Sequence, residues 1–336
     1  MAMKLSTRAI VVSLCLVLVF FAGQPAAAHG DRGKKGTVGD KVYQIVAKEI
    51  RDNSGVGPAL IRLLFHDCWV NGCDGSVLLD RKPYGSKTEK QAENNIGLDG
   101  FDVIDKIKAK LGDNVSCADI VVLAAREATF IVSREKIDYP VKTGRMDGVV
   151  SSAEVADHFL PPSTFDFEQL KANFDVKKFN TKELVALSGA HAIGVAHKSS
   201  FADRIDDATA TPISLDYMNA LKKDDKPIQP NNIRDKELAF RNASGYDPSG
   251  VDTTDDTGKG VLDNSYYHAN LQNTVLFRSD WELRNDTSSD AGGIMETFKE
   301  DAKEWYRQFG DAMAKLSKLP AEGTRFEIRK NCRKTN

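Results

Sequence analysis

Apolar residues recur every three or four positions along several segments of the chain, and charged residues fill most of the positions between them. Such stripes run over residues 41–50, 57–66, 101–111, 180–187 and 295–316, and the more apolar segment 118–131 predicts a more buried helix. This spacing places the apolar side chains on one face of an α-helix. The alternation that is typical of a half-buried β-strand is scarce, so the pattern predicts a mainly α fold.

The ends of the predicted helices carry their own signals. Pro58 stands in the first turn of the second helix, where its missing N–H is not needed. Asn180 and Glu183 have the spacing of a capping box, which predicts that a short helix begins there. Polar stretches separate the helices at 80–99, 133–163, 203–264 and 278–293. No repeat or shift of composition marks a linker, so residues 29–336 are predicted to form a single domain.

The N-terminus has the pattern of a secretory signal peptide over residues 1–28. Lys4 and Arg8 precede an apolar run at residues 10–21, and small residues follow at 26–28. A membrane anchor is the alternative, but this run is about 12 residues long and a spanning helix needs roughly 20. Cleavage removes Cys15 and leaves four cysteines, which in an oxidising compartment form two disulfides in one of three pairings.

The composition narrows the classes of protein further. Lys and Arg number 46 against 48 Asp and Glu, and this balance offers no basic surface for nucleic acid. With 41% hydrophobic residues, the chain is not of the disordered class. No other segment approaches the length of a transmembrane helix. Three sequons fit a secreted route and predict glycans on surface loops: Asn114, Asn242 and Asn285.

Residues 62–76, RLLFHDCWVNGCDGS, hold the densest set of chemically active side chains. Arg62 and His66 are four positions apart and therefore share one face of the predicted helix. A cation beside an imidazole on an apolar helix is costly to bury without a purpose. Asp67, Asp74 and Ser76 follow with the oxygen-ligand spacing of a Ca²⁺ site. An ordinary helix end with a disulfide-closed turn explains the same segment equally well on its own.

Two further segments matter by association. In LSGAHAIG (187–194), His191 stands between small residues that let a flat group approach the backbone, although a core histidine is the commoner explanation of such a pattern. The segment LDNSYY (262–267) is followed by Ser279 and Asp280, and lone aspartates are normally surface residues. Neither segment identifies a site by itself.

Taken together, these segments resemble the secreted plant haem peroxidases, the class III family, from about Val42 to Asn336. RLLFHDCWVNGCDGS is similar to the family's distal signature and ELVALSGAHAIG (183–194) to its proximal one. VSCADI, LDNSYY, RSDWEL and the terminal IRKNC follow in the family's order. The resemblance implies the haem-peroxidase fold, with haem b between a distal and a proximal helical half. It also implies a monomer that reduces H₂O₂ and oxidises small phenolic donors, without a nucleic-acid or membrane partner.

The resemblance assigns roles around the haem. His66 corresponds to the distal general acid and base, and Arg62 to the cation that stabilises charge as the O–O bond breaks. Asn95 would accept a hydrogen bond from His66, and Glu89 would in turn hold Asn95, as in the family's EKxAxxN pattern. Phe65 would wall the distal pocket.

On the proximal side, His191 corresponds to the axial iron ligand and Asp280 to the carboxylate that binds its other ring nitrogen. Pro161 resembles the family proline whose carbonyl orients phenolic donors at the haem edge.

The resemblance also implies calcium. The distal site would take its oxygens from Asp67, Val70, Gly72, Asp74 and Ser76. The proximal site is expected to be weak, altered or empty, because alanine replaces the usual threonine after the proximal histidine and the upstream spacing is irregular. Its residues would be Ala192, Asp255, Thr257, Val261 and Asp263.

Cysteines depart from the family pattern in pairs. The family usually has four disulfides, and the cysteines that remain correspond to two of them, Cys68–Cys73 and Cys117–Cys332. The chain ends shortly after Cys332, without a C-terminal extension of the kind that this family uses for vacuolar sorting. The expected location is therefore the apoplast or cell wall.

Two functions remain open from the sequence. The first is an active haem peroxidase that oxidises phenolic donors in two one-electron steps. The second is a secreted, non-catalytic, calcium-binding glycoprotein on a degenerated peroxidase scaffold, which the lost cysteines and Ala192 favour slightly. A weaker idea is that cleavage exposes His29 as a copper ligand, although no motif places a partner histidine.

Overall fold

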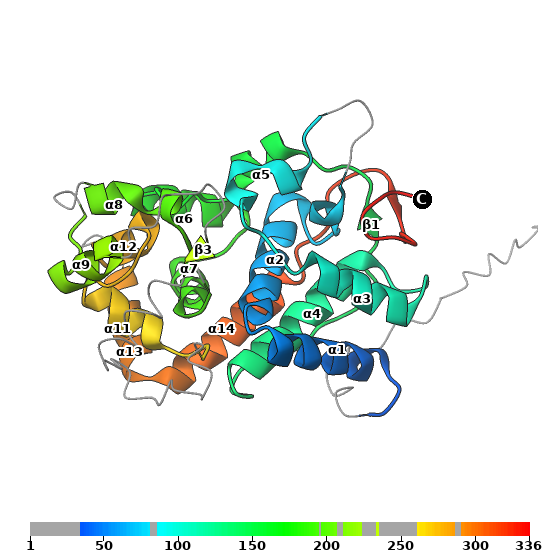
Figure 1. Ribbon diagram of the computed structural model, residues 1–336, viewed down its shortest axis with the longest axis horizontal. Coiled ribbons are helices and arrows are strands. Elements are labelled where there is room, and N and C mark those ends of the chain that lie inside the picture. Colours follow the sequence, from blue (N-terminus) through cyan, green and yellow to red (C-terminus); the bar gives the residue numbers. More distant parts are fainter. Residues whose placement is uncertain are drawn as a thin grey trace, which may run out of the picture.

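The computed structural model describes residues 34–80, 86–194, 196–206, 211–223, 233–234, 261–285 and 290–336. Within these ranges the regular structure is almost wholly helical (Figure 1). The strands there are two-residue segments that pair antiparallel, β1 (Asp147–Gly148) with β4 (Phe326–Glu327) and β2 (Ala196–His197) with β3 (Ile233–Arg234). The predicted mainly α fold is confirmed. The predicted signal peptide lies outside the described residues.

The first group of helices surrounds a buried one. It consists of α1 (Val38–Asp52), α2 (Val56–Asn71), α3 (Phe101–Leu111) and α4 (Cys117–Val132). Helix α4 packs against the other three, and its residues 117–129 are all buried. A helix that is buried on every side is expected at the centre of such a group. The apolar patterns that predicted these four helices are confirmed.

The second group of helices lies on the other side of α2 (Figure 1). It contains α6 (Phe167–Val176), α7 (Thr181–Ser188), α11 (Ser265–Leu271) and α13 (Ala291–Glu300). Helix α14 (Ala302–Leu316) packs against both α7 and α2 and so joins the two groups. One hydrophobic cluster continues through both groups, from Trp69 to Trp305. Because this packed cluster joins the two groups of helices, it holds the two walls of the cavity between them at a fixed distance.

Short elements connect the helices. They are η1 (Ser76–Leu78), η3 (Glu89–Gln91), η4 (Glu93–Asn95), α5 (Ala153–Phe159), η5 (Gly189–Ala192), η6 (Lys198–Ser200), α8 (Ala202–Asp206), α9 (Leu215–Lys223) and α12 (Arg278–Asn285). Several of them lie in stretches that we expected to be irregular. That expectation was wrong for α5, α8, α9 and α12, because short helices are stabilised by tertiary packing and need no long apolar stripe.

The C-terminal stripe at 295–316 does not form the one long helix that its spacing predicts. It forms α13 and α14, which are separated at Asp301, a residue with φ −123° and ψ 88°. The Asp301 side chain accepts a hydrogen bond from the backbone N–H of Glu304 at 3.0 Å. Aspartate is a strong N-cap residue, so the local cap overrides a stripe that continues in register.

Two disulfides join the described cysteines. Cys68 is bonded to Cys73 at the end of α2, and Cys117 at the start of α4 is bonded to Cys332. Both pairings that the resemblance implied are confirmed.

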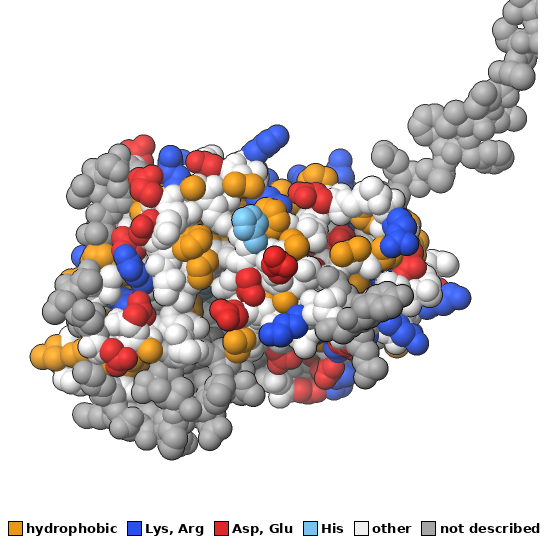
Figure 2. All heavy atoms as spheres, turned by 90° about the horizontal axis from the view of Figure 1, so that it is seen from above, with side chains coloured by type: hydrophobic (Ala, Val, Ile, Leu, Met, Phe, Trp, Pro, Cys, Tyr) orange, Lys and Arg blue, Asp and Glu red, His pale blue; other side chains and the backbone are white. Residues whose placement is uncertain are grey.

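The charged side chains on one face of the molecule are mixed in sign. Figure 2 shows acidic, basic and apolar side chains scattered over one face, on which Lys and Arg do not gather into a patch. In the part of the chain that the structure describes, no helix combines the length and apolar character that crossing a membrane requires.

Candidate active site

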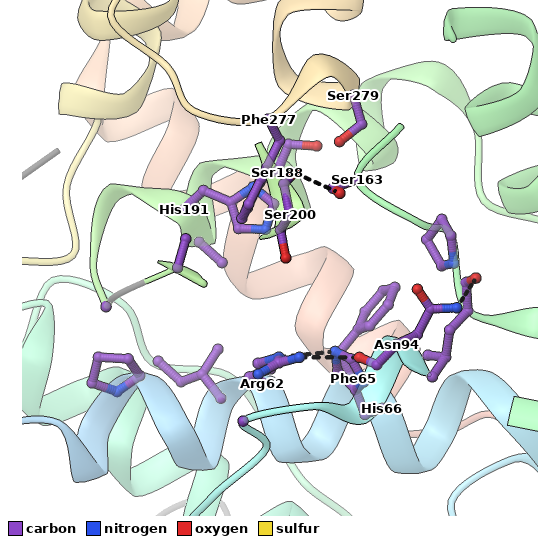
Figure 3. A pocket seen from close by; sticks show the side chains of 18 of the residues that line it. Arg62, Phe65, His66, Asn94, Ser163, Ser188, His191, Ser200, Phe277 and Ser279 are labelled. Atoms are coloured by element: carbon purple, nitrogen blue, oxygen red, sulfur yellow. Dashed lines mark hydrogen bonds between the residues drawn. The ribbon is translucent and has the colours of Figure 1, made fainter. Parts of the chain in front are cut away.

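A cavity of about 550 Å³ lies between the two groups of helices. Arg62, Phe65 and His66 line it from α2, and His191 and Phe277 line it from the opposite side (Figure 3). The segments that the sequence singled out therefore meet at one place, although they lie far apart in the chain.

Helix α2 presents Arg62 and His66 together. They lie one turn apart on the same face, and Arg62 Nε donates to His66 Nε2 at 3.2 Å. The helix begins at Val56 with Pro58 in its first turn and ends at Asn71, with Gly72 as its C-cap. Gly72 has φ +80°, and a Cβ there would collide with the main chain of Pro320. Only glycine therefore allows the tight exit from α2.

A second residue sets the orientation of His66. Its Nδ1 lies 2.5 Å from Oδ1 of Asn95, and Asn95 Nδ2 donates to the carbonyl oxygen of Glu89 at 2.7 Å. Because an amide oxygen only accepts, His66 carries its proton on Nδ1 and leaves Nε2 basic. Glu89 does hold Asn95, as we expected, but it does so through its main chain and not through its carboxylate.

Burial decides the charge state of this pair. Burial, followed by the nearby Arg62 cation, lowers the pKa of His66 well below its usual value. Burial also lowers the pKa of Arg62, to about 10, which leaves the guanidinium charged at neutral pH. The cavity therefore holds a neutral imidazole with a fixed tautomer beside a permanent cation.

Main-chain carbonyls anchor Arg62. Its Nη2 donates to the carbonyl oxygens of Asn94, which lies in η4, and of Ile96, which directly follows η4. The loop is itself held by Asp157 of α5, whose carboxylate accepts from the backbone N–H groups of Glu93 and Asn94 at 3.1 and 3.0 Å. Sequence reasoning missed Asp157 and these carbonyls, and no motif in the chain marks them.

Aromatic side chains form the distal wall. The Phe65 ring stacks on Trp69 with centroids 4.7 Å apart, and Trp69 Nε1 donates to Asn173 Oδ1 at 2.9 Å. Phe65 lines the cavity, as the resemblance implied, and Pro161 also lines it.

The proximal histidine follows directly from α7. The predicted capping box is present, because Asn180 and Glu183 each accept a hydrogen bond from the other's backbone N–H. Helix α7 then runs into η5, which carries His191. A Cβ on Gly189 would lie 2.7 Å from Trp305 Nε1 and Tyr267 Oη, so the backbone packs closely there.

A buried carboxylate holds His191. The distance from His191 Nδ1 to Asp280 Oδ1 is 2.9 Å, and Asp280 comes from α12, eighty-nine residues later. Two more side chains reach Asp280: Tyr266 Oη donates to the same Oδ1, and Asn270 Nδ2 donates to the main-chain carbonyl. Nothing in the LDNSYY pattern marks Tyr266 as a partner of Asp280, because the contact forms only when α11 and α12 pack.

The residues of the predicted distal calcium site lie close together after α2. Asp67, Asp74 and Ser76 are buried, and the Asp67 Oδ1 and Ser76 Oγ atoms have no hydrogen-bond partner among the described residues. Burial raises the pKa of Asp67 and that of Asp74, the latter to about 6. The Val70 carbonyl accepts from Lys177 Nζ at 3.2 Å. No group of three or more His, Cys, Asp or Glu side chains in the described ranges is placed to hold a metal, so a calcium ion here would need hydroxyl and carbonyl oxygens as well.

The predicted proximal calcium site is only partly visible. Ala192, Val261 and Asp263 are buried, and Asp263 Oδ1 accepts from the backbone N–H of Ser265. Asp255 and Thr257 lie outside the described residues.

The sequons differ in their setting. Asn114 is exposed in the turn after α3, in agreement with a surface loop. Asn285 is the last residue of α12, so the expectation of a loop was wrong there; the helix continues because Trp281 and Leu283 pack into the core. Asn242 lies outside the described residues, as does His29.

Known proteins are similar to this chain over most of its length. A family model described as peroxidase matches residues 42–301. Peroxidase 2 of Zea mays is 38% identical over 303 residues, which cover 86% of this chain and 83% of that protein. Peroxidase 24 of Arabidopsis thaliana is 38% identical over 309 residues, covering 88% and 83%. Peroxidase 60 of Arabidopsis thaliana is 32% identical and covers 100% of this chain and 98% of its own length. The chain therefore belongs to the plant class III peroxidase family of enzymes.

Proposed function

We propose that this peroxidase binds haem b between His66 and His191, reduces hydrogen peroxide to water there and oxidises phenolic donors in one-electron steps. One observation carries the proposal. Two histidines face the same cavity from opposite sides, and each has its own oxygen partner, Asn95 for His66 and Asp280 for His191.

The cavity suits a flat, largely apolar cofactor. Its volume is in the range of ordinary ligand sites. Phe65, Leu187, Phe277 and Met313 give it apolar walls, and His191 offers a ring nitrogen on the side opposite Arg62. When bound, the haem supplies a redox-active iron that exchanges electrons with peroxide and with donors.

His66 moves the proton in this proposal. Hydrogen peroxide must lose a proton from one oxygen and gain one on the oxygen that leaves as water. The neutral Nε2 accepts the first proton and later returns it. It is free to do so because the hydrogen bond to Asn95 keeps the ring's own proton on Nδ1 and holds the ring in one orientation. The lowered pKa of His66 keeps Nε2 able to accept at neutral pH.

Arg62 stabilises negative charge on the departing oxygen. Its guanidinium is fixed by the carbonyls of Asn94 and Ile96 before the reaction begins. A preorganised donor of this kind is worth several kcal/mol in other enzymes, roughly 3–4 per hydrogen bond.

His191 and Asp280 act on the other side. The Asp280 carboxylate draws the Nδ1 proton and makes the imidazole a stronger ligand, which favours oxidised iron. Pro161 and Phe65 border the space in which a phenolic donor would lie.

We also propose one calcium ion at the loop that follows α2. Burying the carboxylates of Asp67 and Asp74 side by side is costly, and a cation repays that cost. The unpartnered Asp67 Oδ1 and Ser76 Oγ supply two oxygens, and the carbonyls of Val70 and Gly72 would supply two more. We keep the proximal site as weak, altered or empty.

The two disulfides support export, because such bonds persist in oxidising compartments. We therefore propose cleavage of residues 1–28 and an extracellular monomer in the apoplast or cell wall.

Haem loading tests the enzymatic proposal against the non-catalytic alternative. The full chain, expressed with a supply of haem, is expected to show a Soret band and to oxidise guaiacol with H₂O₂. A folded protein that binds calcium but shows no Soret band would instead establish the degenerated scaffold.

A further inference from the structure

Two hydrogen bonds converge on one oxygen atom behind the proximal histidine. Asp280 Oδ1 accepts from His191 Nδ1 and from Tyr266 Oη, each at 2.9 Å. Tyr266 belongs to α11, whereas Asp280 belongs to α12, and these helices pack against each other. The two donors therefore compete for the electron density of the same carboxylate oxygen.

The setting makes this competition strong. Tyr266 is 1% exposed and Asp280 2% exposed, so water does not screen either group. Burial and the Asp280 carboxylate raise the pKa of Tyr266 well above its usual value, which keeps the phenol protonated and able to donate. Asn270 Nδ2 donates to the main-chain carbonyl of Asp280 at 2.5 Å and lies 3.4 Å from Tyr266 Oη. Asn270 thereby holds both partners in place.

We propose that Tyr266 is a positioning residue that limits the basicity of Asp280 and so raises the reduction potential of the iron that His191 holds. This inference rests on the proposed function, because it requires His191 to be the axial ligand.

The physical reason is the sharing of one acceptor. Charge-assisted hydrogen bonds are strong, and a carboxylate that gives part of its charge to a phenol polarises an imidazole less. Loss of the phenol hydroxyl returns that charge to the His191 bond. The imidazole then gains anionic character, which favours the ferric over the ferrous iron.

The neighbouring tyrosine provides a matched control. Tyr267 is equally buried, but its hydroxyl donates to the carbonyl oxygens of Val185 and Ala186 in α7. Tyr266→Phe and Tyr267→Phe each remove one buried hydroxyl from adjacent positions of α11. Only the first change alters the bonding of Asp280.

The experiment measures the ferric/ferrous midpoint potential of the haem-loaded full chain by spectroelectrochemistry. Tyr266→Phe is expected to favour the ferric form about tenfold, a shift of about 59 mV to more negative potential for one electron. Tyr267→Phe is expected to stay at the wild-type value. The iron–histidine stretching frequency, read by resonance Raman, is expected to rise only in Tyr266→Phe. Equal potentials and frequencies in both variants and the wild type would overturn the proposal.

A second substitution covers the case in which Tyr266→Phe does not fold. Site-specific 3-fluorotyrosine at position 266 keeps the shape and makes the phenol a stronger donor, so the potential is expected to rise. A fall or no change would overturn the proposal.

The Soret band distinguishes failure of the proposed function from failure of the Tyr266 proposal. Absence of the band in the wild type refutes both together. With the band present, unshifted potentials refute the role of Tyr266 alone.

Discussion

His66 and His191 line the same cavity, and their immediate neighbours give them opposite properties. Burial and the nearby Arg62 cation lower the pKa of His66 more than its hydrogen bond to the Asn95 amide raises it, so His66 stays an uncharged base. His191 is bonded to the buried carboxylate of Asp280, which draws its Nδ1 proton. One side-chain type is therefore a candidate proton acceptor on one side and a candidate metal ligand on the other.

Replacing His66 with alanine tests its role directly. We expect His66→Ala to slow the reaction with H₂O₂ by roughly 10²- to 10⁴-fold, because no other basic nitrogen would take the proton. The rate is measured by stopped-flow at the Soret band, which should remain. His158→Ala, which removes an exposed histidine of α5, serves as control and should react like the wild type. Equal rates in both variants would exclude His66 as the base.

The pH dependence follows from the direction of the His66 pKa. An unfolded histidine titrates near about 6.5, and in the folded protein His66 titrates at lower pH. The rate constant for H₂O₂ is therefore expected to stay flat as pH falls through about 6.5 and to drop only in more acidic solution. Because the unfolded chain binds this proton first, folding stability falls as pH drops from about 6.5 towards the lower pKa of folded His66, before the rate itself declines. A kinetic midpoint at or above 6.5 would contradict the prediction.

At the scale of elements, short helices and turns hold the side chains of Arg62 and His66 in position. Helix α5 holds η4 through Asp157, and η4 in turn supplies Asn95 to His66 and two carbonyls to Arg62. Asp157 does not line the cavity, yet it holds the loop that contacts both residues of the distal pair.

We expect Asp157→Ala to loosen this loop. The change removes two bonds to backbone N–H groups, for a cost of about 1–3 kcal/mol in unfolding free energy. It should also slow the H₂O₂ reaction by about tenfold or more, as losses of supporting hydrogen bonds do at metal sites. Urea unfolding and stopped-flow kinetics measure the two effects. Glu154→Ala, at an exposed position of the same helix, should change stability by less than about 0.5 kcal/mol and leave the rate unaltered.

At the scale of the whole molecule, the two disulfides are expected to contribute unequally. Cys117–Cys332 spans 215 positions and Cys68–Cys73 spans five. The chain-entropy model gives about 5 kcal/mol for the first and about 2 kcal/mol for the second. The paired serine variants should follow this order in urea unfolding. A smaller loss for the Cys117/Cys332 pair would show that strain or residual structure dominates.

Removal of calcium tests whether the proposed calcium ion stabilises the whole fold. Dialysis against EDTA should lower the melting temperature, and added Ca²⁺ should restore it, because an ion that binds only the folded chain stabilises it. Elemental analysis should find about one tightly bound ion for each chain. Two tightly bound ions would contradict the expectation of a defective proximal site.

Much of the fold and site was predictable because the relevant signals are local. The apolar patterns over 101–111 and 118–131 and the capping box at Asn180 correspond to α3, α4 and the start of α7. The break at Asp301 was missed because the apolar stripe continues through it, while the cap depends on one side chain. Asn94 and Ile96 were missed because they act through main-chain carbonyls, which every residue possesses.

The sequence by itself determined the helical character of the chain, the family resemblance and the pairing of reactive residue types within each motif, because these depend on spacing along one helix or loop. Only the tertiary structure decided which atoms of different motifs meet. The sharing of Asp280 Oδ1 by His191 and Tyr266 depends on the packing of α11 and α12, and the support of Arg62 depends on α5. Such contacts join residues far apart in the chain, and their geometry follows from how whole helices pack rather than from any local pattern.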